Sequence, residues 1–501
     1  MSLFQINKRK ILHTWEEEMS SIFEGLKPSF IWKHFEQILK IPHCSGDEKA
    51  LGDYIALVAE RLGLAWKRDN VGNIVVEKKA SPGHEKAETI ILQGHLDMVG
   101  EKNSDVDFDF SKDAIEAEMK GDWIQAKGTT LGSDNGIGVA ASLALMEEET
   151  SVHGPLEFLF TVDEETGLTG ATKIEPNFLK GKKLLNLDSE DEGAFTIGCA
   201  GGADSEITIP LERKKGEGEL YKLKIFGFRG GHSGLDINQG RGNAIKLLAR
   251  ILWQAQMEFS FVLVRMEGGN KRNAIPREAW ADLFLISEQF NALSSFFQKA
   301  FEKIKFEYKA VEKEANFSFE KSEAEKEDAL TFQSQKTLIN FLFSLVHGAI
   351  AMHPEMEDLV ETSTNLAIIH THPDHAQIIC SSRSSISSAL EATRNTIAAL
   401  SELAGARVNQ PEGYPAWTPN LESPLLKSLK EIYQKTFQKQ PEVGAVHAGL
   451  ECGIIGEKFP GMDMISFGPT IEHPHSPEER VHIGSVEKFW KFLTTLLAEL
   501  A

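Results

Sequence analysis

The sequence predicts an α/β protein in which helices cover a sheet. Short apolar runs, each ended by glycine or by acidic residues, recur through the first third of the 501-residue chain. A segment with the composition and length of a helix, residues 136–149, lies between two of these runs. The last forty or so residues repeat the same order of strand, loop and helix. Such alternation is typical of a sheet with helices packed on it.

Four runs in the first third are short and apolar enough to be buried strands. They are residues 73–78, 89–94, 156–162 and 183–188. Near the carboxyl end, a strand at about 464–467 precedes a loop and a closing amphipathic helix. We therefore expect the end of the chain to fold together with the first third, in one domain made of residues 1–205 and 412–501. Residues 1–25 carry no motif and form an extension of unknown role.

Residues 206–411 have a different pattern, which predicts a smaller inserted α+β domain. The alternating segment 221–228 is typical of a strand that is half buried. Two amphipathic segments near 242–256 and 388–405 predict helices.

The charge balance excludes two classes of partner. The chain has 53 basic and 74 acidic residues, a net charge of -21. This acidity opposes attraction to phosphate backbones and anionic lipids, so nucleic acid and membrane surfaces are not expected partners.

Nothing in the sequence indicates a membrane span or a secreted protein. No stretch approaches 18 unbroken apolar residues, and the first residues lack the order of a signal peptide. The cysteines are far apart and unpatterned, which favours reduced, mostly buried thiols over disulfides or a thiolate zinc site. They are Cys44, Cys199, Cys380 and Cys452. We expect a cytoplasmic protein.

Metal-ligating side chains occur in succession at the ends of the predicted strands and, for Asp134, just before a predicted helix. The residues are His95, Asp134, Glu164, Glu165 and Asp188, and the segment HPHSPEE follows the last strand. One such residue after a strand is ordinary, and an isolated H-x-D is most often a solvated loop. Reactive groups in α/β sheets gather beyond the carboxyl ends of strands, however, so the succession predicts one site. Imidazole with carboxylate and no cysteine is the ligand set of divalent metals in hydrolases, with zinc, manganese and cobalt all suitable.

The same segments resemble a known family. The order GHLDMV, GSDNG, DEETG, NLDSED, GGHSG and GPTIEHPHSPEE is similar to that of the di-zinc exopeptidases related to bacterial carboxypeptidase, most specifically the aminoacyl-histidine dipeptidases. The resemblance spans from about residue 25 to the carboxyl end. It implies a zinc-exopeptidase-like mixed sheet, an inserted lid domain and a homodimer formed through the lid.

The resemblance also implies an activity, the hydrolysis of dipeptides with a free amino terminus, Xaa-His dipeptides among them, by metal-activated water. It implies two divalent ions, zinc first, with manganese or cobalt as alternatives. An amidohydrolase or deacylase on the same scaffold is a competing interpretation, because fold does not fix substrate. A metal-binding protein without turnover is another, against which the presence of Glu164 argues.

Individual metal ligands follow from the resemblance. His95 would bind one ion, Asp134 would bridge both ions, and Glu165 would bind the ion opposite the one bound by Asp188. The pattern places the last ligand immediately before Ser-Pro-Glu, which assigns His475. We interpret its neighbour His473 as a loop histidine, because most histidines bind no metal.

Two further roles belong to the surroundings of the ions. Glu164 would remain unligated and act as general base. We expect the two adjacent glutamates to lie in a strand-like segment, where neighbouring side chains point apart and can take different roles. Asp97, expected on the strand face of His95, would orient a ligand by a hydrogen bond. The resemblance further implies a cis peptide between Asp134 and Asn135.

The inserted domain supplies the candidate substrate-binding residues. The resemblance implies that His232 reaches the scissile carbonyl, from its own subunit or from a partner; alone, a glycine-rich turn with a histidine is more often only a turn. Arg383 can hold a substrate carboxylate bidentately, with a surface ion pair as the alternative. Gly268, Gly269 and Asn273 offer backbone and amide donors, unless they only form a tight connection. His447 and Glu451 are expected near the catalytic centre.

Overall fold

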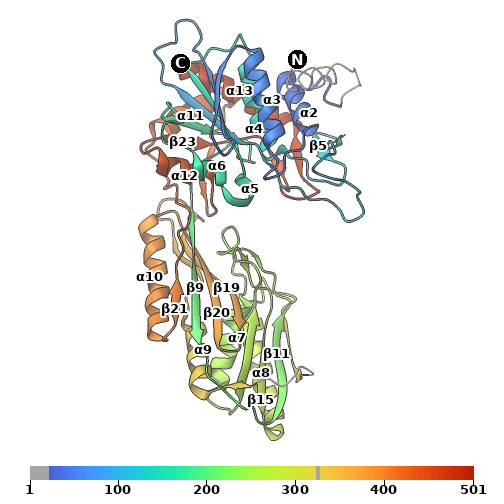
Figure 1. The fold of residues 1–501 in the computed structure, drawn as a ribbon, viewed down its shortest axis with the longest axis vertical. Coiled ribbons are helices and arrows are strands. Elements are labelled where there is room, and N and C mark those ends of the chain that lie inside the picture. The colour runs from blue at the N-terminus through green and yellow to red at the C-terminus, as the bar shows by residue number, and fades with distance from the viewer. Residues whose placement is uncertain (1–21, 323–327) are drawn as a thin grey trace. The chain divides into compact units, whose positions relative to one another are not determined.

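The structure is a computed structural model that describes residues 22–322 and 328–501 (Figure 1). Part of the expected extension, residues 1–21, lies outside the described residues. The chain divides into two compact units, of which the first comprises 1–195, 422–443 and 458–501 and the second 196–421 and 444–457. The expected domain limits differ from these units by residues 196–205, 412–421 and 444–457.

The main sheet of the first unit is mixed, as expected. Its strand order is β1-β2-β6-β3-β7-β23-β8-β22. The strands are β1 (Ala65–Arg68), β2 (Ile74–Lys78), β6 (Leu156–Thr161), β3 (Ile90–His95), β7 (Lys183–Asn186), β23 (Asp463–Ser466), β8 (Ala194–Cys199) and β22 (Glu442–Val446). Strands β6, β3, β7 and β23 run parallel, whereas β1 and β2 pair antiparallel. Strands β3 and β6 are buried at every residue, which explains why apolar residues dominate them.

Helices cover this sheet because each buries an apolar side. Helices α2 (Ser29–Leu39), α3 (Lys49–Arg61) and α4 (Ser133–Glu147) pack together, with α4 against β3. Helix α4 is buried almost all round, so it has no polar face. Helices α11 (Pro424–Phe437) and α13 (Ile483–Glu499) pack against each other, and α13 is the predicted closing helix. No helix among the described residues is long and apolar enough to cross a membrane.

Shorter elements surround the carboxyl edge of the sheet. They are α5 (Glu164–Gly167), α6 (Thr169–Lys173) and a small sheet with the order β24-β25-β5-β4. The strands of that small sheet are β24 (Ile471–Glu472), β25 (Arg480–His482), β5 (Trp123–Ala126) and β4 (Ala117–Lys120). The loop between β24 and β25 carries the segment HPHSPEE.

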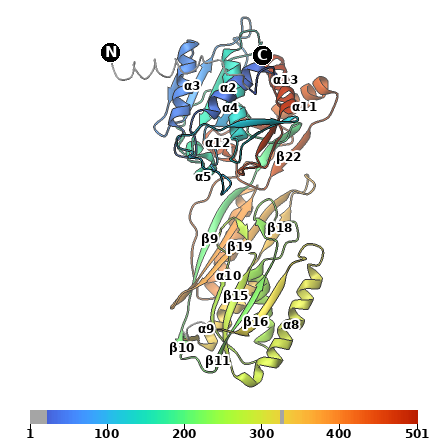
Figure 2. The same cartoon turned by 90° about the vertical axis from the view of Figure 1, so that its right-hand side faces the viewer.

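The second unit is the predicted α+β fold (Figure 2). Its sheet has the order β16-β11-β15-β13-β19-β20-β9-β21, with β18 beside β19, and its pairs are antiparallel. The strands are β9 (Gly201–Pro210), β11 (Glu219–Phe226), β13 (Val262–Gly268), β15 (Ala279–Leu285), β16 (Asn316–Lys321), β18 (Gly348–Met352), β19 (Val360–Thr371), β20 (His375–Ser384) and β21 (Arg407–Asn409). Two-stranded pairs are formed by β10 (Arg213–Lys214) with β17 (Ala329–Leu330), and by β12 (Gly231–His232) with β14 (Ala274–Ile275).

The helices of the second unit complete its core. They are α7 (Ala244–Ala255), α8 (Phe290–Glu307), α9 (Phe332–Ser344), α10 (Ser387–Leu403) and the shorter α12 (Glu451–Lys458). Helix α7 packs against four strands of the sheet and against α8 and α9. Asn243 caps it by accepting a hydrogen bond from the Lys246 N–H, which satisfies one of the unpaired donors of the first turn.

Candidate metal centre

The five predicted ligands lie together, and three of them follow parallel strands at one edge of the main sheet. His95 is the last residue of β3, Asp188 follows β7, and Glu165 follows β6 in α5. Asp134 lies at the amino end of α4, and His475 lies in the loop between β24 and β25. The carboxyl ends of parallel strands meet at the same edge, which is why residues far apart in the sequence converge.

Asp134 lies between the two histidines. Its Oδ1 is 3.1 Å from His95 Nε2, and its Oδ2 is 3.2 Å from His475 Nε2. Asp188 Oδ1 lies 3.2 Å from His95 Nε2, and Glu165 Oε2 lies 3.0 Å from His475 Nε2. The side chains therefore form two sets that share Asp134, one completed by His95 and Asp188 and the other by His475 and Glu165.

The donor atoms fit a pair of divalent cations. His95 Nδ1 lies 3.0 Å from the Asp97 carbonyl oxygen. If the proton is on Nδ1, the Nε2 atom of the neutral imidazole points its lone pair at two carboxylate oxygens. These groups repel one another unless a cation or a proton lies between them. Glu165 Oε1 and Asp188 Oδ1 are buried and accept no hydrogen bond within the described part of the chain. Buried carboxylates without donors are costly unless they bind a cation.

Without metal, the excess of carboxylates shifts the pKa values. Hydrogen bonds to Asp134 and Glu165 raise the pKa of His475 to about 11. Burial raises the pKa of Asp188 to about 7, although the neighbouring His95 opposes this change. Burial also opposes ionisation of Asp134, but hydrogen bonds from His475 and His95 hold its pKa below the usual range. The site thus retains protons where cations would bind.

Asp97 lies just beyond the end of β3 and holds the glutamate segment. Its carboxylate accepts hydrogen bonds from the backbone N–H groups of Glu164 (3.0 Å) and Glu165 (3.1 Å) and from the Ser45 hydroxyl (2.8 Å). The Asp97 carbonyl oxygen, rather than its carboxylate, makes the closer contact with His95. Asp97 therefore positions both a histidine and the two glutamates, a wider role than the sequence predicted.

The prediction of a strand-like segment at the two glutamates was wrong. Glu164 and Glu165 begin the short helix α5. The preceding Asp163 has a left-handed φ of 52°, which turns the chain out of β6, and Asp97 then fixes the first two N–H groups of the helix. Successive helical side chains project about 100° apart, which still separates the two carboxylates.

Glu479 is the main residue at this site to which the sequence analysis gave no role. It is 2% exposed, and its carboxylate accepts from the backbone N–H groups of Leu131, Gly132, Ser133 and Asp134 and from the Ser133 hydroxyl. The loop that carries His475 is thereby fastened to the backbone that presents Asp134. The adjacent acidic pair in HSPEE was the only signal in the sequence.

Two details of the backbone bear on the sequence predictions. The peptide between Asp134 and Asn135 is cis, which confirms that prediction. His473 is exposed and belongs to neither ligand set, which is consistent with a loop histidine. Both His473 and His475 have a left-handed φ, so the loop turns sharply at each.

In the second unit, the surroundings of His232 set its tautomer. Its Nδ1 accepts hydrogen bonds from the backbone N–H groups of Gly234 (3.3 Å) and Leu235 (3.1 Å). Burial and the nearby Arg383 lower the pKa of His232. The imidazole is therefore neutral with its proton on Nε2, which makes Nε2 a donor suited to a carbonyl oxygen.

Arg383 is a buried cation rather than a surface ion pair. It is 8% exposed in β20, and its Nη1 donates to the Tyr414 hydroxyl at 2.7 Å. Its Nε has no hydrogen-bond partner in the described regions. A buried guanidinium with an unused donor suits a carboxylate ligand. Tyr414, which orients it, was not predicted.

His447 and Glu451 are buried, at 5% and 1% exposure. His447 Nε2 lies 2.7 Å from the Ser363 hydroxyl. Burial, followed by the charges of Arg383 and His232, lowers the pKa of His447 to about 4. The electrostatic coupling of the three residues indicates one polar cluster within this unit. Glu451 begins α12.

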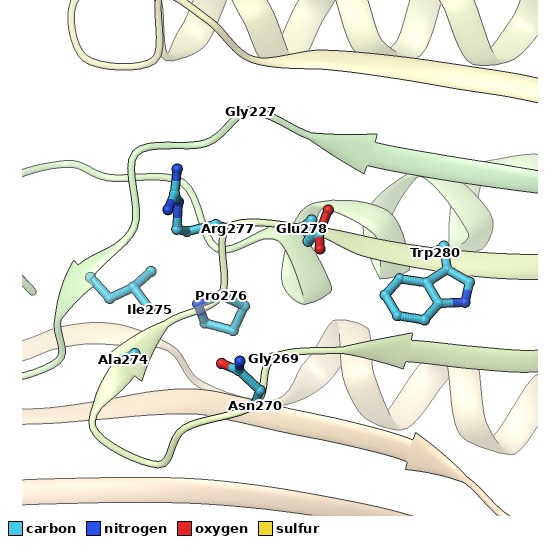
Figure 3. Close-up of a pocket in the computed structure, with 9 residues that line it drawn as sticks. All are labelled: Gly227, Gly269, Asn270, Ala274, Ile275, Pro276, Arg277, Glu278 and Trp280. Carbon is cyan, nitrogen blue, oxygen red and sulfur yellow. The ribbon is translucent and has the colours of Figure 1, made fainter. Parts of the chain in front are cut away.

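The two glycines of GGNKRNAIP have a packing explanation. A Cβ on Gly269 would lie 1.8 Å from the Ala367 carbonyl oxygen, and one on Gly268 would lie 2.7 Å from Ile245. Asn273 is exposed, and its carbonyl oxygen accepts from the Ser233 N–H. The same segment lines a cavity of about 570 Å³ with Arg277, Glu278 and Trp280 (Figure 3). A substrate role for Gly268, Gly269 and Asn273 stays a prediction.

The fold and these ligand sets define a metallopeptidase class. Residues 91–499 match the model of peptidase family M20/M25/M40, and the chain belongs to this family.

Individual relatives agree with that membership. The cytosol non-specific dipeptidase of Escherichia coli is 41% identical over 95% of this chain and 98% of its own. The crystal structure of aminoacylhistidine dipeptidase from Vibrio alginolyticus is 40% identical, with a TM-score of 0.89 over 96% of this chain and 98% of its own. Aminopeptidase PepT from Bacillus cereus, 15% identical with a TM-score of 0.56 over 95% of this chain and 99% of its own, shares the fold.

Proposed function

We propose that this chain is a metal-dependent dipeptidase acting on dipeptides with a free amino terminus, Xaa-His dipeptides among them. The observation that carries this proposal is the position of Asp134 between two imidazoles, which gives two ligand sets in one site. The substrate class is supported by the names of two relatives at 40% and 41% identity.

Two divalent ions, zinc first and manganese or cobalt as alternatives, would polarise the scissile carbonyl and lower the pKa of the attacking water. Asp134 would hold both ions, with His95 and Asp188 on one and His475 and Glu165 on the other. Glu164 would take the proton of the water and pass it to the leaving amine, as a general base and then a general acid.

The second unit would recognise the substrate. His232 Nε2–H would donate to the scissile carbonyl, and the Arg383 guanidinium, held by Tyr414, would bind the carboxylate of the dipeptide. Asn273, Gly268, Gly269, His447 and Glu451 would complete the surroundings. We also propose a cytoplasmic homodimer that forms through the second unit, on the resemblance described above.

A substrate panel tests the function. The zinc-loaded protein is assayed on free dipeptides, on the same dipeptides acetylated at the amino terminus, and on N-acetyl amino acids. Hydrolysis of the free dipeptides alone is expected. Faster hydrolysis of N-acetyl amino acids would identify a deacylase, and two bound ions without turnover on any substrate would identify a silent metal-binding protein.

A further inference from the structure

A second group of metal-ligating side chains lies in the second unit, at the turn that joins β19 to β20. Three histidines fall within the six residues of HTHPDH. The ring centroid of His372 is 4.4 Å from that of His370 and 4.4 Å from that of His375. Glu267, from the adjacent strand β13, accepts a hydrogen bond from His370 Nδ1.

The hairpin explains why the His372 ring lies against the rings of both His370 and His375. Residues two apart on a strand point to the same face, which places His370 and His372 together. The His372 N–H donates to the His375 carbonyl oxygen at 2.8 Å, so these two residues face each other across the turn. Four groups from three segments of chain thus occupy one face of the sheet.

The backbone of the turn is held independently of its side chains. Arg213 donates to the carbonyl oxygens of Pro373 (Nε, 2.6 Å) and His372 (Nη2, 3.0 Å). A turn fixed in this way does not have to be ordered when a ligand binds, which lowers the entropic cost of binding.

The hydrogen bonds leave metal-binding nitrogens available. The Nδ1 atoms of His370 and His375 contact Glu267 and Asp374, so the Nε2 atom of each ring remains for a metal. His372 stacks on His375 with their planes 20° apart, so the rings must turn edge-on to share an ion. The rings have room to rotate in this way, since the side chains of His370 and His375 are 54% and 34% exposed.

We propose that this hairpin binds one divalent transition metal ion through the imidazoles of His370, His372 and His375, with Glu267 supporting His370. Imidazole ligands suit zinc, nickel and copper, and short histidine-rich tracts are typical metal sites. This site shares no residue with the ligand sets of the first unit, so it does not depend on the proposed activity.

Zinc uptake tests the proposal. The protein is saturated at its first-unit site and dialysed against buffers of defined free zinc, and bound zinc is counted by atomic emission. The double variant His372→Gln/His375→Gln is compared with the wild type and with His84→Gln, a control in the first unit. At micromolar free zinc, the wild type and the control should each hold one ion more than the double variant, with dipeptide hydrolysis equal in all three.

Equal zinc content in all three proteins over the whole range of free zinc would overturn the proposal, whatever the content at the first-unit site. Copper(II) added to the zinc-loaded protein gives a second readout. Nitrogen hyperfine coupling should appear in the electron paramagnetic resonance spectrum of the wild type and disappear in the double variant. Identical spectra would contradict the proposal in the same way.

Discussion

His475 Nε2 lies 3.2 Å from Asp134 Oδ2, although 341 residues separate the two side chains. The other carboxylate oxygen of Asp134 faces His95, so each oxygen serves a different imidazole. This relationship gives the centre two ligand sets and makes their contributions separable by substitution.

His475→Ala should remove one ion of the pair and leave the ion held by His95 and Asp188. The expected result is half the wild-type metal content with loss of hydrolysis, measured by atomic emission and a dipeptide assay. The adjacent His473→Ala is the matched control and should retain both ions and activity. Full metal content in the His475 variant would contradict the assignment.

Glu164→Gln should abolish hydrolysis while both ions stay bound, because Glu164 is proposed to move protons. Glu165→Gln should instead weaken metal binding, since Glu165 Oε2 faces His475 at 3.0 Å. Metal titration of the two variants separates the roles. If the Glu164 variant loses metal and the Glu165 variant keeps it, the two assignments are reversed.

Glu479→Gln should lower metal affinity although Glu479 belongs to neither ligand set. A glutamine presents an NH₂ group to backbone donors that now face carboxylate oxygens, and each unsatisfied group costs about 1 to 3 kcal/mol. Zinc affinity should fall about 10- to 100-fold, the range for residues that support metal ligands. The exposed neighbour Glu478 gives the control Glu478→Gln, and equal zinc affinities in the two variants would exclude this role.

Arg383→Ala should lower kcat/KM for free dipeptides far more than kcat/KM for dipeptides with an amidated carboxyl terminus. Only the free dipeptides lose a charge-assisted contact, which contributes about 1.5 to 3 kcal/mol. Tyr414→Phe should give a smaller loss with the same selectivity, because it removes the hydroxyl that orients the guanidinium. Equal losses in kcat/KM on both substrate types would rule out carboxylate binding by Arg383.

The sequence predicted the parts of this fold that depend on local patterns. Short apolar runs such as residues 90–92 identify buried strands, and the metal-ligating residues that follow several of them in succession identify the site. The closing helix and the α+β character of the second unit also follow from periodicity.

Residues that act through tertiary contacts could not be predicted in this way. Tyr414 has no periodic or motif signal, and the HSPEE segment does not show what Glu479 binds. Their partners, the Arg383 guanidinium and the backbone before Asp134, are set only by the folded chain. The helical start at Glu164 was missed for a similar reason. It depends on hydrogen bonds to Asp97, which lies 67 residues earlier.

Metal removal and replacement tests the central claim most directly. Chelated protein is assayed on a free Xaa-His dipeptide while zinc is returned in measured equivalents. The account predicts no hydrolysis without metal and activity that rises to a plateau at two zinc ions per chain bound at this centre. Full hydrolysis by metal-free protein, or a plateau with the first ion, would contradict it.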